Sequence, residues 1–124
     1  MSTIEPITEY LEVDLDRETW RCTRCGREHG SARESYKHGL LVHERDPREI
    51  HRPLIDPEAY EYTFAPDPQW CRILEYCCPG CAAMVEVEYL PPGHPITHDI
   101  ELDLDWFKRR AAARAAANGT EETA

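Results

Sequence analysis

The stretches Cys22-Thr23-Arg24-Cys25-Gly26 and Cys78-Pro79-Gly80-Cys81 decide the fold, because each carries two cysteines with the same spacing. In a C-x-x-C turn both sulfurs converge on one ion while backbone N–H groups point at them, and a structural zinc ion takes four such ligands. Gly26 and Gly80 can take the positive φ angle that these turns often need. We therefore predict one tetrahedral metal site with the ligands Cys22, Cys25, Cys78 and Cys81.

The four thiolates leave the identity of the metal open between two candidates. Zinc is the leading one, because structural zinc sites are tetrahedral and rich in cysteine. Iron is the alternative, since C-x-x-C-G paired with C-P-x-C is also the local pattern of rubredoxin and tetrahedral sulfur suits either metal. A third interpretation is a redox dithiol at Cys78 and Cys81, as in thioredoxin-like proteins, but strand-like segments flank this pair where that chemistry needs a helix.

The chain has 124 residues, of which 41% are hydrophobic, so it has room for one domain that burial alone stabilises only marginally. Structural zinc contributes about 10–16 kcal/mol of apparent binding free energy in small peptides, which is comparable with the whole stability of a domain. The segment between Cys25 and Cys78 is longer than the roughly 15–20 residues of the common paired pattern. We expect residues 1–119 to form a single zinc-ribbon-like domain, with a disordered tail over 120–124.

The formal charge is −10, from 24 acidic against 14 basic residues, so the molecule as a whole repels a nucleic acid backbone. This disfavours a nucleic-acid-binding zinc ribbon. The first residues have neither a basic start nor an apolar segment, and no stretch approaches the roughly 18 apolar residues of a membrane span. We expect a cytoplasmic protein with no membrane and no nucleic acid partner, in which cysteines are metal ligands or free thiols.

Alternation of apolar and polar residues predicts several strands. Residues 10–16 and 98–104 alternate with period two, which places one set of side chains on a buried face. Residues 72–76 and 84–89 flank the second cysteine pair and predict a zinc-ribbon hairpin. The inward side chains expected in the first and last of these strands are Leu11, Val13, Leu15, Ile100, Leu102 and Leu104.

The segment from residue 31 to residue 69 carries five prolines, so neither long helices nor central strands can run through it. We expect it to be mostly irregular. A connection of this length is unusual unless it serves function or lies on a partner. Its aromatic side chains can anchor it to the domain's own core or to an interface. These aromatic residues are Tyr60, Tyr62, Phe64 and Trp70.

A C-terminal helix follows the last expected strand. Asp105 is placed to cap it, an alanine and arginine run carries it to Ala117, and Asn118-Gly119 supplies a stop. Its face of Phe107 and alanines either docks on another subunit or stays solvated. The chain is thus expected to be α+β, mostly β, with zinc-ribbon-like hairpins, a long irregular excursion and a C-terminal helix.

The sequence shows no catalytic constellation. Its six histidines have no metal-binding spacing, no serine sits in a nucleophile elbow, and there is no glycine-rich phosphate loop. His98 and Asp99 could form an acid-base pair, but adjacent strand residues point to opposite faces, so we expect a structural role for them. Cys71 and Cys77 are expected to be small buried hydrophobic residues.

A longer pattern surrounds the second cysteine pair. The block Glu75-Tyr76-Cys77-Cys78-Pro79-Gly80-Cys81, followed by Val87-Glu88 and by Pro95-x-x-His98-Asp99, resembles the small zinc-binding subunit of acetone and acetophenone carboxylases. Ser35-Tyr36-Lys37 and Trp70 also fit that family. The block with its downstream His-Asp pair is much more specific than a bare C-x-x-C motif.

The resemblance covers residues 20–106, with two departures. Family members often have glycine where this chain has Ala82, and a tyrosine-like residue where it has Cys77. The middle segment favours the aromatic ketone branch over the acetone branch.

The resemblance implies a structural, zinc-binding, non-catalytic subunit of an ATP-dependent, biotin-independent ketone carboxylase, which makes a β-keto acid from a ketone, bicarbonate and ATP. In that family, large hydantoinase-type subunits bind the ketone and ATP with Mg²⁺ or Mn²⁺, and they perform enol phosphorylation and carboxylation. This chain would carry only the structural Zn²⁺ within the hetero-oligomer. The alternatives are a rubredoxin-like electron carrier and a zinc-ribbon module that binds another protein or a nucleic acid.

Overall fold

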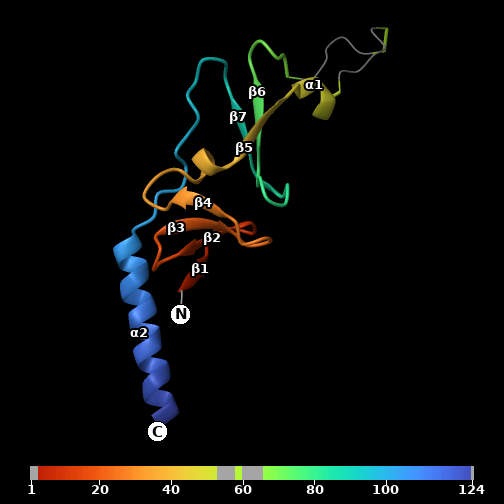
Figure 1. The fold of residues 1–124 in the computed structure, drawn as a ribbon. Helices are drawn as coiled ribbons and strands as arrows, with labels where there is room; N and C mark the ends of the chain where they lie inside the picture. The colour runs from red at the N-terminus through yellow and green to blue at the C-terminus, as the bar shows by residue number, and fades with distance from the viewer. Residues whose placement is uncertain (1–2, 53–57, 60–65, 124) are drawn as a thin grey trace. The chain divides into compact units, whose positions relative to one another are not determined.

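The computed structural model describes residues 3–52, 58–59 and 66–123 (Figure 1). The chain divides into two compact units. The first unit consists of Met1–Gly39 and His98–Ala124, and the second consists of Leu40–Thr97. Most of the regular structure is antiparallel sheet, and one long helix ends the chain, so the expected α+β, mostly β class is confirmed.

The first unit holds a four-stranded antiparallel sheet in the order β1-β2-β3-β4 (Figure 1). Its strands are β1 Ile4–Pro6, β2 Leu11–Asp14, β3 Thr19–Cys22 and β4 Glu28–Ser31. A 3₁₀ helix, η1, follows at Tyr36–Gly39. Each strand pairs with the next along the chain, so short turns make all the connections within the sheet.

The core of the first unit forms on the face that the alternation predicts. Leu11, Val13 and Leu15 are at most 2% exposed, although β2 itself ends at Asp14. On the neighbouring strand Trp20 is fully buried and meets Tyr36 edge-to-face, with ring centroids 5.7 Å apart. Aromatic pairs in this geometry stabilise beyond their buried area.

The helix α2, Leu104–Thr123, differs from expectation at both ends. The cap is Asp103, whose carboxylate accepts a hydrogen bond from the Trp106 N–H at 3.0 Å, rather than Asp105, which lies in the first turn. The helix also continues through Asn118-Gly119 to Thr123. A single glycine within a helix costs only about 1 kcal/mol relative to alanine, so it permits a stop without forcing one.

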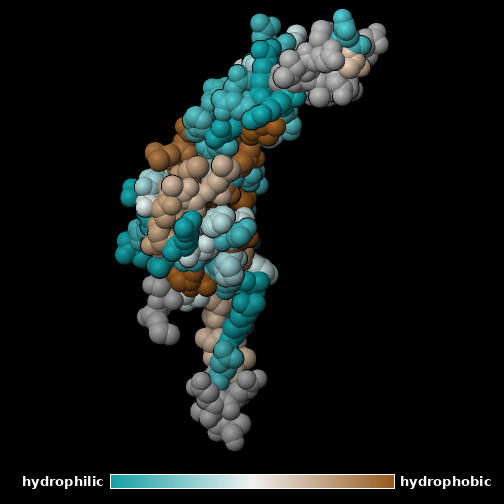
Figure 2. Space-filling view, turned by 90° about the vertical axis from the view of Figure 1, so that its right-hand side faces the viewer, coloured by the Kyte–Doolittle hydropathy of each residue, from teal (hydrophilic) through white to brown (hydrophobic). Residues whose placement is uncertain are grey.

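Ion pairs attach α2 to the rest of the first unit. Arg110 and Arg114 reach the buried carboxylate of Glu5 at 2.8 and 3.6 Å, and Lys108 reaches Glu18 at 2.7 Å. Figure 2 shows the helix with a teal row of charged side chains beside a pale brown row of alanines. Ala111 and Ala115, with Leu15, are among the residues that line a groove of about 440 Å³.

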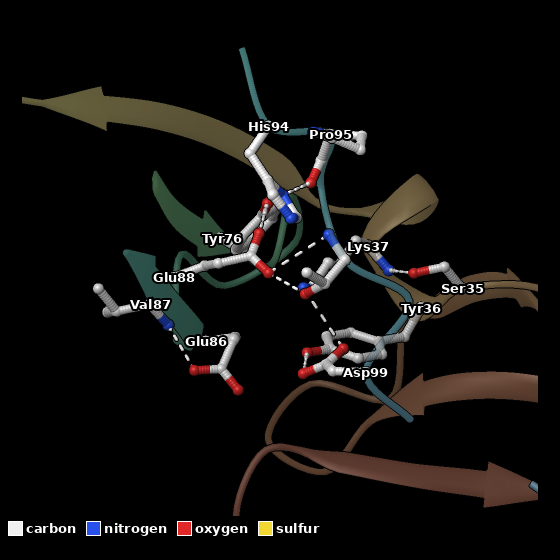
Figure 3. A network of polar contacts seen from close by, with 11 residues as sticks. Ser35, Tyr36, Lys37, Tyr76, Glu86, Val87, Glu88, His94, Pro95 and Asp99 are labelled. Atoms are coloured by element: carbon white, nitrogen blue, oxygen red, sulfur yellow. Dashed lines mark hydrogen bonds and ion pairs between the residues drawn. The ribbon is translucent and has the colours of Figure 1, made fainter. Parts of the chain in front are cut away.

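The strand expected over 98–104 is not formed. Residues 98–103 are without regular structure, and Leu104, which is 3% exposed, begins α2. The carboxylate of Asp99 instead accepts a hydrogen bond from the Tyr36 hydroxyl at 3.0 Å and pairs with the buried ammonium of Lys37 at 3.3 Å (Figure 3). The sequence of residues 98–103 does alternate between apolar and polar side chains. The contacts of Asp99, rather than hydrogen bonds to a neighbouring strand, hold the segment in place.

The second unit holds a three-stranded antiparallel sheet in the order β5-β6-β7. Its elements are β5 Leu41–Arg45, the short helix α1 Pro47–Ile50, β6 Arg72–Cys77 and β7 Met84–Leu90. The hairpin predicted around the second cysteine pair is therefore confirmed. In β6 the four residues from Ile73 to Tyr76 are all buried, so the central strand is covered on both faces.

The segment from residue 31 to residue 69 contains more regular structure than its prolines suggest. It contains η1, β5 and α1, and Pro47 begins α1 behind the capping carboxylate of Asp46. β5 could not be predicted from alternation, because four of its five residues are exposed and none of the five forms a buried face. The expectation that no central strand crosses this segment holds, since β5 is at the sheet edge.

The aromatic residues of this segment are only partly placed. Tyr60, Tyr62 and Phe64 lie outside the described residues. Trp70 is 77% exposed, so it does not cover the core of its unit. In the same unit, Glu88 accepts a hydrogen bond from the Tyr76 hydroxyl (Figure 3). It also accepts one from the Thr97 hydroxyl. Among the described residues, no helix has the length and apolar character that crossing a bilayer requires.

Candidate metal centre

The first cysteine pair sits in a turn that leaves β3. Cys22 ends the strand and is buried, whereas Cys25 is exposed. The Gly26 N–H donates to the Cys22 carbonyl at 3.0 Å, and the Cys22 N–H donates to the Arg27 carbonyl at 2.8 Å. Gly26 has φ +79°, as its place in the motif predicts.

The second cysteine pair sits in a turn that leaves β6. Cys78 is buried and Cys81 is half-buried. The Ala82 N–H donates to the Cys78 carbonyl at 2.8 Å, and the Cys78 N–H donates to the Ala83 carbonyl at 2.9 Å. The Gly80 N–H also points at the Cys78 Sγ, at 3.3 Å, which is the kind of contact that stabilises a thiolate.

The two turns have matching backbone hydrogen bonds at matching positions. In each, the residue after the second cysteine donates back to the carbonyl of the first, and the first cysteine donates to the residue five positions on. The left-handed residue is therefore the one after the second cysteine in both turns: Gly26 in one and Ala82, with φ +62°, in the other. The expectation of a positive φ at Gly80 was wrong, and comparison with Gly26 could have identified Ala82.

The four cysteines that the sequence singles out are close together. The sulfurs of Cys22, Cys25, Cys78 and Cys81 all lie within 4.8 Å of one another, so the group could hold a metal ion. Zinc–sulfur bonds of about 2.3 Å in a tetrahedron place the sulfurs about 3.8 Å apart. The spacing and the donor set both suit such an ion.

The remaining cysteines are not members of this group. Cys71 and Cys77 are half-buried rather than buried, so the expectation that both are interior residues was only partly right. Cys77 lies next to Cys78 but ends β6, where its ladder partner is Met84. Its backbone is thus part of the β6–β7 ladder, which has an irregularity between Tyr76 and Cys77.

Arg21 supports the first turn from the side. It pairs with Glu12 across the β2–β3 ladder at 2.9 Å, and its guanidinium lies where a Cβ on Gly26 would meet it at 3.1 Å. The neighbouring His29 is 3% exposed, and no hydrogen bond to either ring nitrogen is formed by the described residues. Burial, with the nearby charge of Arg27, lowers the pKa of His29.

The histidine-aspartate pair has no catalytic arrangement. Asp99 is engaged by Tyr36 and Lys37, and His98 is exposed. The sequence pattern did not reveal these partners of Asp99, because Tyr36 and Lys37 lie more than sixty positions earlier in the chain.

Comparison with known proteins places the chain in a family. Residues 5–112 match the family described as the acetone carboxylase gamma subunit. The chain is 60% identical over 103 residues to the acetophenone carboxylase beta subunit of Aromatoleum aromaticum, covering 83% of this chain and 78% of that protein. It is 35% identical over 89 residues to the acetone carboxylase gamma subunit of Xanthobacter autotrophicus, covering 72% of this chain and 49% of that longer protein. The chain therefore belongs to the acetone carboxylase gamma subunit family, as the resemblance around Cys78 and Cys81 indicates.

Proposed function

We propose that this chain is a structural, zinc-binding, non-catalytic small subunit of an ATP-dependent, biotin-independent ketone carboxylase of the acetophenone carboxylase type. Such an enzyme joins a ketone to bicarbonate at the expense of ATP and yields a β-keto acid. The observation that carries the proposal is the 60% identity to an acetophenone carboxylase subunit over most of both chains. The 35% identity to the acetone enzyme's subunit makes the aromatic ketone branch the better supported one.

The proposed partners are large hydantoinase-type subunits in a cytoplasmic hetero-oligomer. Those subunits would hold ATP with Mg²⁺ or Mn²⁺ and the ketone. The names of both relatives, as subunits of carboxylases, support an assembly of several chains.

The proposed zinc ligands are Cys22, Cys25, Cys78 and Cys81. The closeness of their sulfurs supports this assignment, as do the matching backbone hydrogen bonds of the two turns. When bound, zinc supplies a charge that offsets the thiolates and joins two distant segments of the chain. It takes no part in redox chemistry.

Replacement of single cysteines by serine tests the ligands. Each of the four ligand variants is expected to lose most of the bound zinc, measured by elemental analysis of the purified protein, and to enter the carboxylase complex poorly. Cys71→Ser and Cys77→Ser are the matched controls, because both are half-buried thiols outside the group, and they should keep full zinc content. Full metal content in all four ligand variants would refute the assignment.

The absorbance of the purified protein separates zinc from iron. A zinc tetrathiolate is colourless, whereas ferric iron in the same ligands absorbs visible light and has a reversible redox transition. A red protein with one iron per chain would replace the structural-zinc proposal with that of an electron carrier.

Co-purification tests the role as a subunit. A tag on this chain, expressed in its native cell, is expected to retrieve larger subunits together with ATP-dependent carboxylation of an aromatic ketone. Retrieval of the chain alone, under conditions where the carboxylase is produced, would contradict the proposal.

A further inference from the structure

The strand β5, Leu41–Arg45, forms one edge of its sheet, and among the described residues no strand pairs with its outer side. In an antiparallel pair, the backbone N–H and C=O groups of alternate residues point away from the partner strand. Natural proteins blunt such edges with charged side chains, especially lysine, with proline or with a covering segment, because an open edge recruits other strands. The first two residues of β5 are neither charged nor proline, whereas Glu44 and Arg45 lie at its C-terminal end.

The first two residues of β5 are large, apolar and exposed. Leu41 is 60% exposed and Val42 is 49% exposed. Consecutive residues of a strand point to opposite faces. The β5–β6 ladder is uninterrupted here, since Leu41 pairs with Cys77 and Val42 pairs with Tyr76. A partner lying flat against one face would cover only one of these side chains. A strand added alongside β5 would cover both, because its own side chains alternate between the faces.

The charged residues of β5 are already engaged within the unit. Glu44 pairs with Arg72 at 2.8 Å, and Arg45 pairs with Glu75 at 3.0 Å and with Glu49 at 2.8 Å. These contacts hold the C-terminal half of the strand in place. The groups left for a partner are the outward backbone and the exposed side chains of Leu41, Val42 and His43.

We propose that β5 binds an extended segment of another subunit of the carboxylase by strand addition. This inference rests on the proposed function and names the surface through which the subunit is held. A second copy of this chain is the less suitable partner, because two molecules of charge −10 repel each other. β5 also lies within residues 5–112, the part of the chain that matches the family of carboxylase subunits.

Lysine substitutions on the two faces test strand addition against docking on one face. Leu41→Lys and Val42→Lys, placed singly in the full chain, are each expected to weaken binding to the remaining carboxylase subunits at least about tenfold, as loss of a central interface contact does. Ile96→Lys is the matched control, because Ile96 is 50% exposed and gains the same charge, and its dissociation constant should stay within about twofold. Weakening by only one of the two β5 variants would overturn strand addition.

Hydrogen exchange reports on the backbone itself. Amides of β5 that point outward are expected to exchange more slowly in the complex than in the isolated chain, both in the wild type and in Ile96→Lys. Unchanged exchange of these amides in the complex would overturn the proposal. A second result would also overturn it: these amides exchange slowly in the isolated chain, and deletion of residues 53–65 makes them exchange fast. The edge would then be covered by residues of this chain and not by a partner.

Two further measurements identify the partner and separate this inference from the proposed function. A wild-type dimer in sedimentation that both β5 variants abolish would assign the edge to a second copy and overturn the proposal. A wild type that fails to bind the remaining subunits at all would contradict the proposed function. Binding of the wild type and of both β5 variants with equal affinity would overturn the strand addition alone.

Discussion

The residue that follows each cysteine pair controls the shape of its turn. Gly26 and Ala82 both adopt left-handed backbone conformations, with φ +79° and +62°, and both donate back to the first cysteine of their pair. For an L-residue with a Cβ this conformation costs about 1–2 kcal/mol. Ala82 therefore stores strain in the second turn that Gly26 avoids in the first.

Ala82→Gly is expected to stabilise the protein by about 1 kcal/mol, because the relief of left-handed strain exceeds the extra entropy of glycine in the unfolded chain. Denaturant unfolding of the metal-loaded protein measures the change. Ala83→Gly is the matched neighbour: Ala83 is buried and has no positive φ, so this variant should be less stable. Gly26→Ala should also destabilise, because alanine at φ +79° is strained and its Cβ would crowd the Arg21 guanidinium. A loss of stability in Ala82→Gly would contradict the strain.

At the scale of elements, α2 is attached to its unit mainly by charge. Its alanines bury little apolar area, and residues 112–118 are exposed. The contacts that hold it are the pairs of Glu5 with Arg110 and Arg114, and the pair of Glu18 with Lys108. Arg110 also lies over the Trp106 ring, 4.7 Å from its centroid.

Arg110→Ala is expected to destabilise the protein by about 2–4 kcal/mol, because it leaves the buried Glu5 carboxylate with only the more distant Arg114. Arg109→Ala is the matched control on the same helix turn. Arg109 is exposed and makes no ion pair among the described residues, so the change should stay within about 0.5 kcal/mol. Equal unfolding midpoints for the two variants would show that the pair with Glu5 does not hold the helix.

Glu18 pairs with Arg33 and with Lys108 of α2, and it makes the stability of the first unit sensitive to acid. Hydrogen bonds from Arg33 and then from Lys108 lower the pKa of its carboxyl from 4.5 to about 2. The stability that this carboxylate contributes is fully present above pH 4.5 and is lost as the pH falls from 4.5 towards 2, because the unfolded chain takes up the proton first. Glu18→Gln should therefore flatten the fall in stability over that range, as followed by thermal melts. Glu9→Gln controls for removal of one exposed carboxylate, and an equal flattening there would contradict the assignment to Glu18.

At the scale of the whole molecule, the sequence predicted what depends on local pattern. The face of Leu11, Val13 and Leu15, the β6–β7 hairpin and the α+β class follow from alternation and turn chemistry, and they are confirmed. Four cysteines of matching spacing were enough to identify the group that could hold a metal. Those predictions needed no knowledge of distant contacts.

The predictions that failed depend on contacts far along the chain. β5 forms because β6 offers it an edge thirty positions later, although its own residues show no buried face. Residues 98–103 alternate like a strand, yet Asp99 is fixed by Tyr36 and Lys37. The cap at Asp103 instead of Asp105 reflects two equivalent acids near one helix start, a choice that propensity alone does not make.

Metal removal is expected to loosen the whole chain. We still predict that residues 1–119 behave as a single domain once zinc is bound, because structural zinc in small proteins contributes about as much free energy as the folded state has in total. Far-UV circular dichroism and melting should therefore both change after complete chelation, and readdition of zinc should restore them. Unchanged spectra and an unchanged melting temperature would show that folding does not depend on the metal.

The metal content of the assembled enzyme tests the central claim most directly. Carboxylase complex retrieved from its native cell through a tag on this chain should contain about one zinc per copy of the chain, with no iron in its place, as four thiolate ligands imply. A complex that retains the chain in full yet contains neither zinc nor another metal at that ratio would contradict the account.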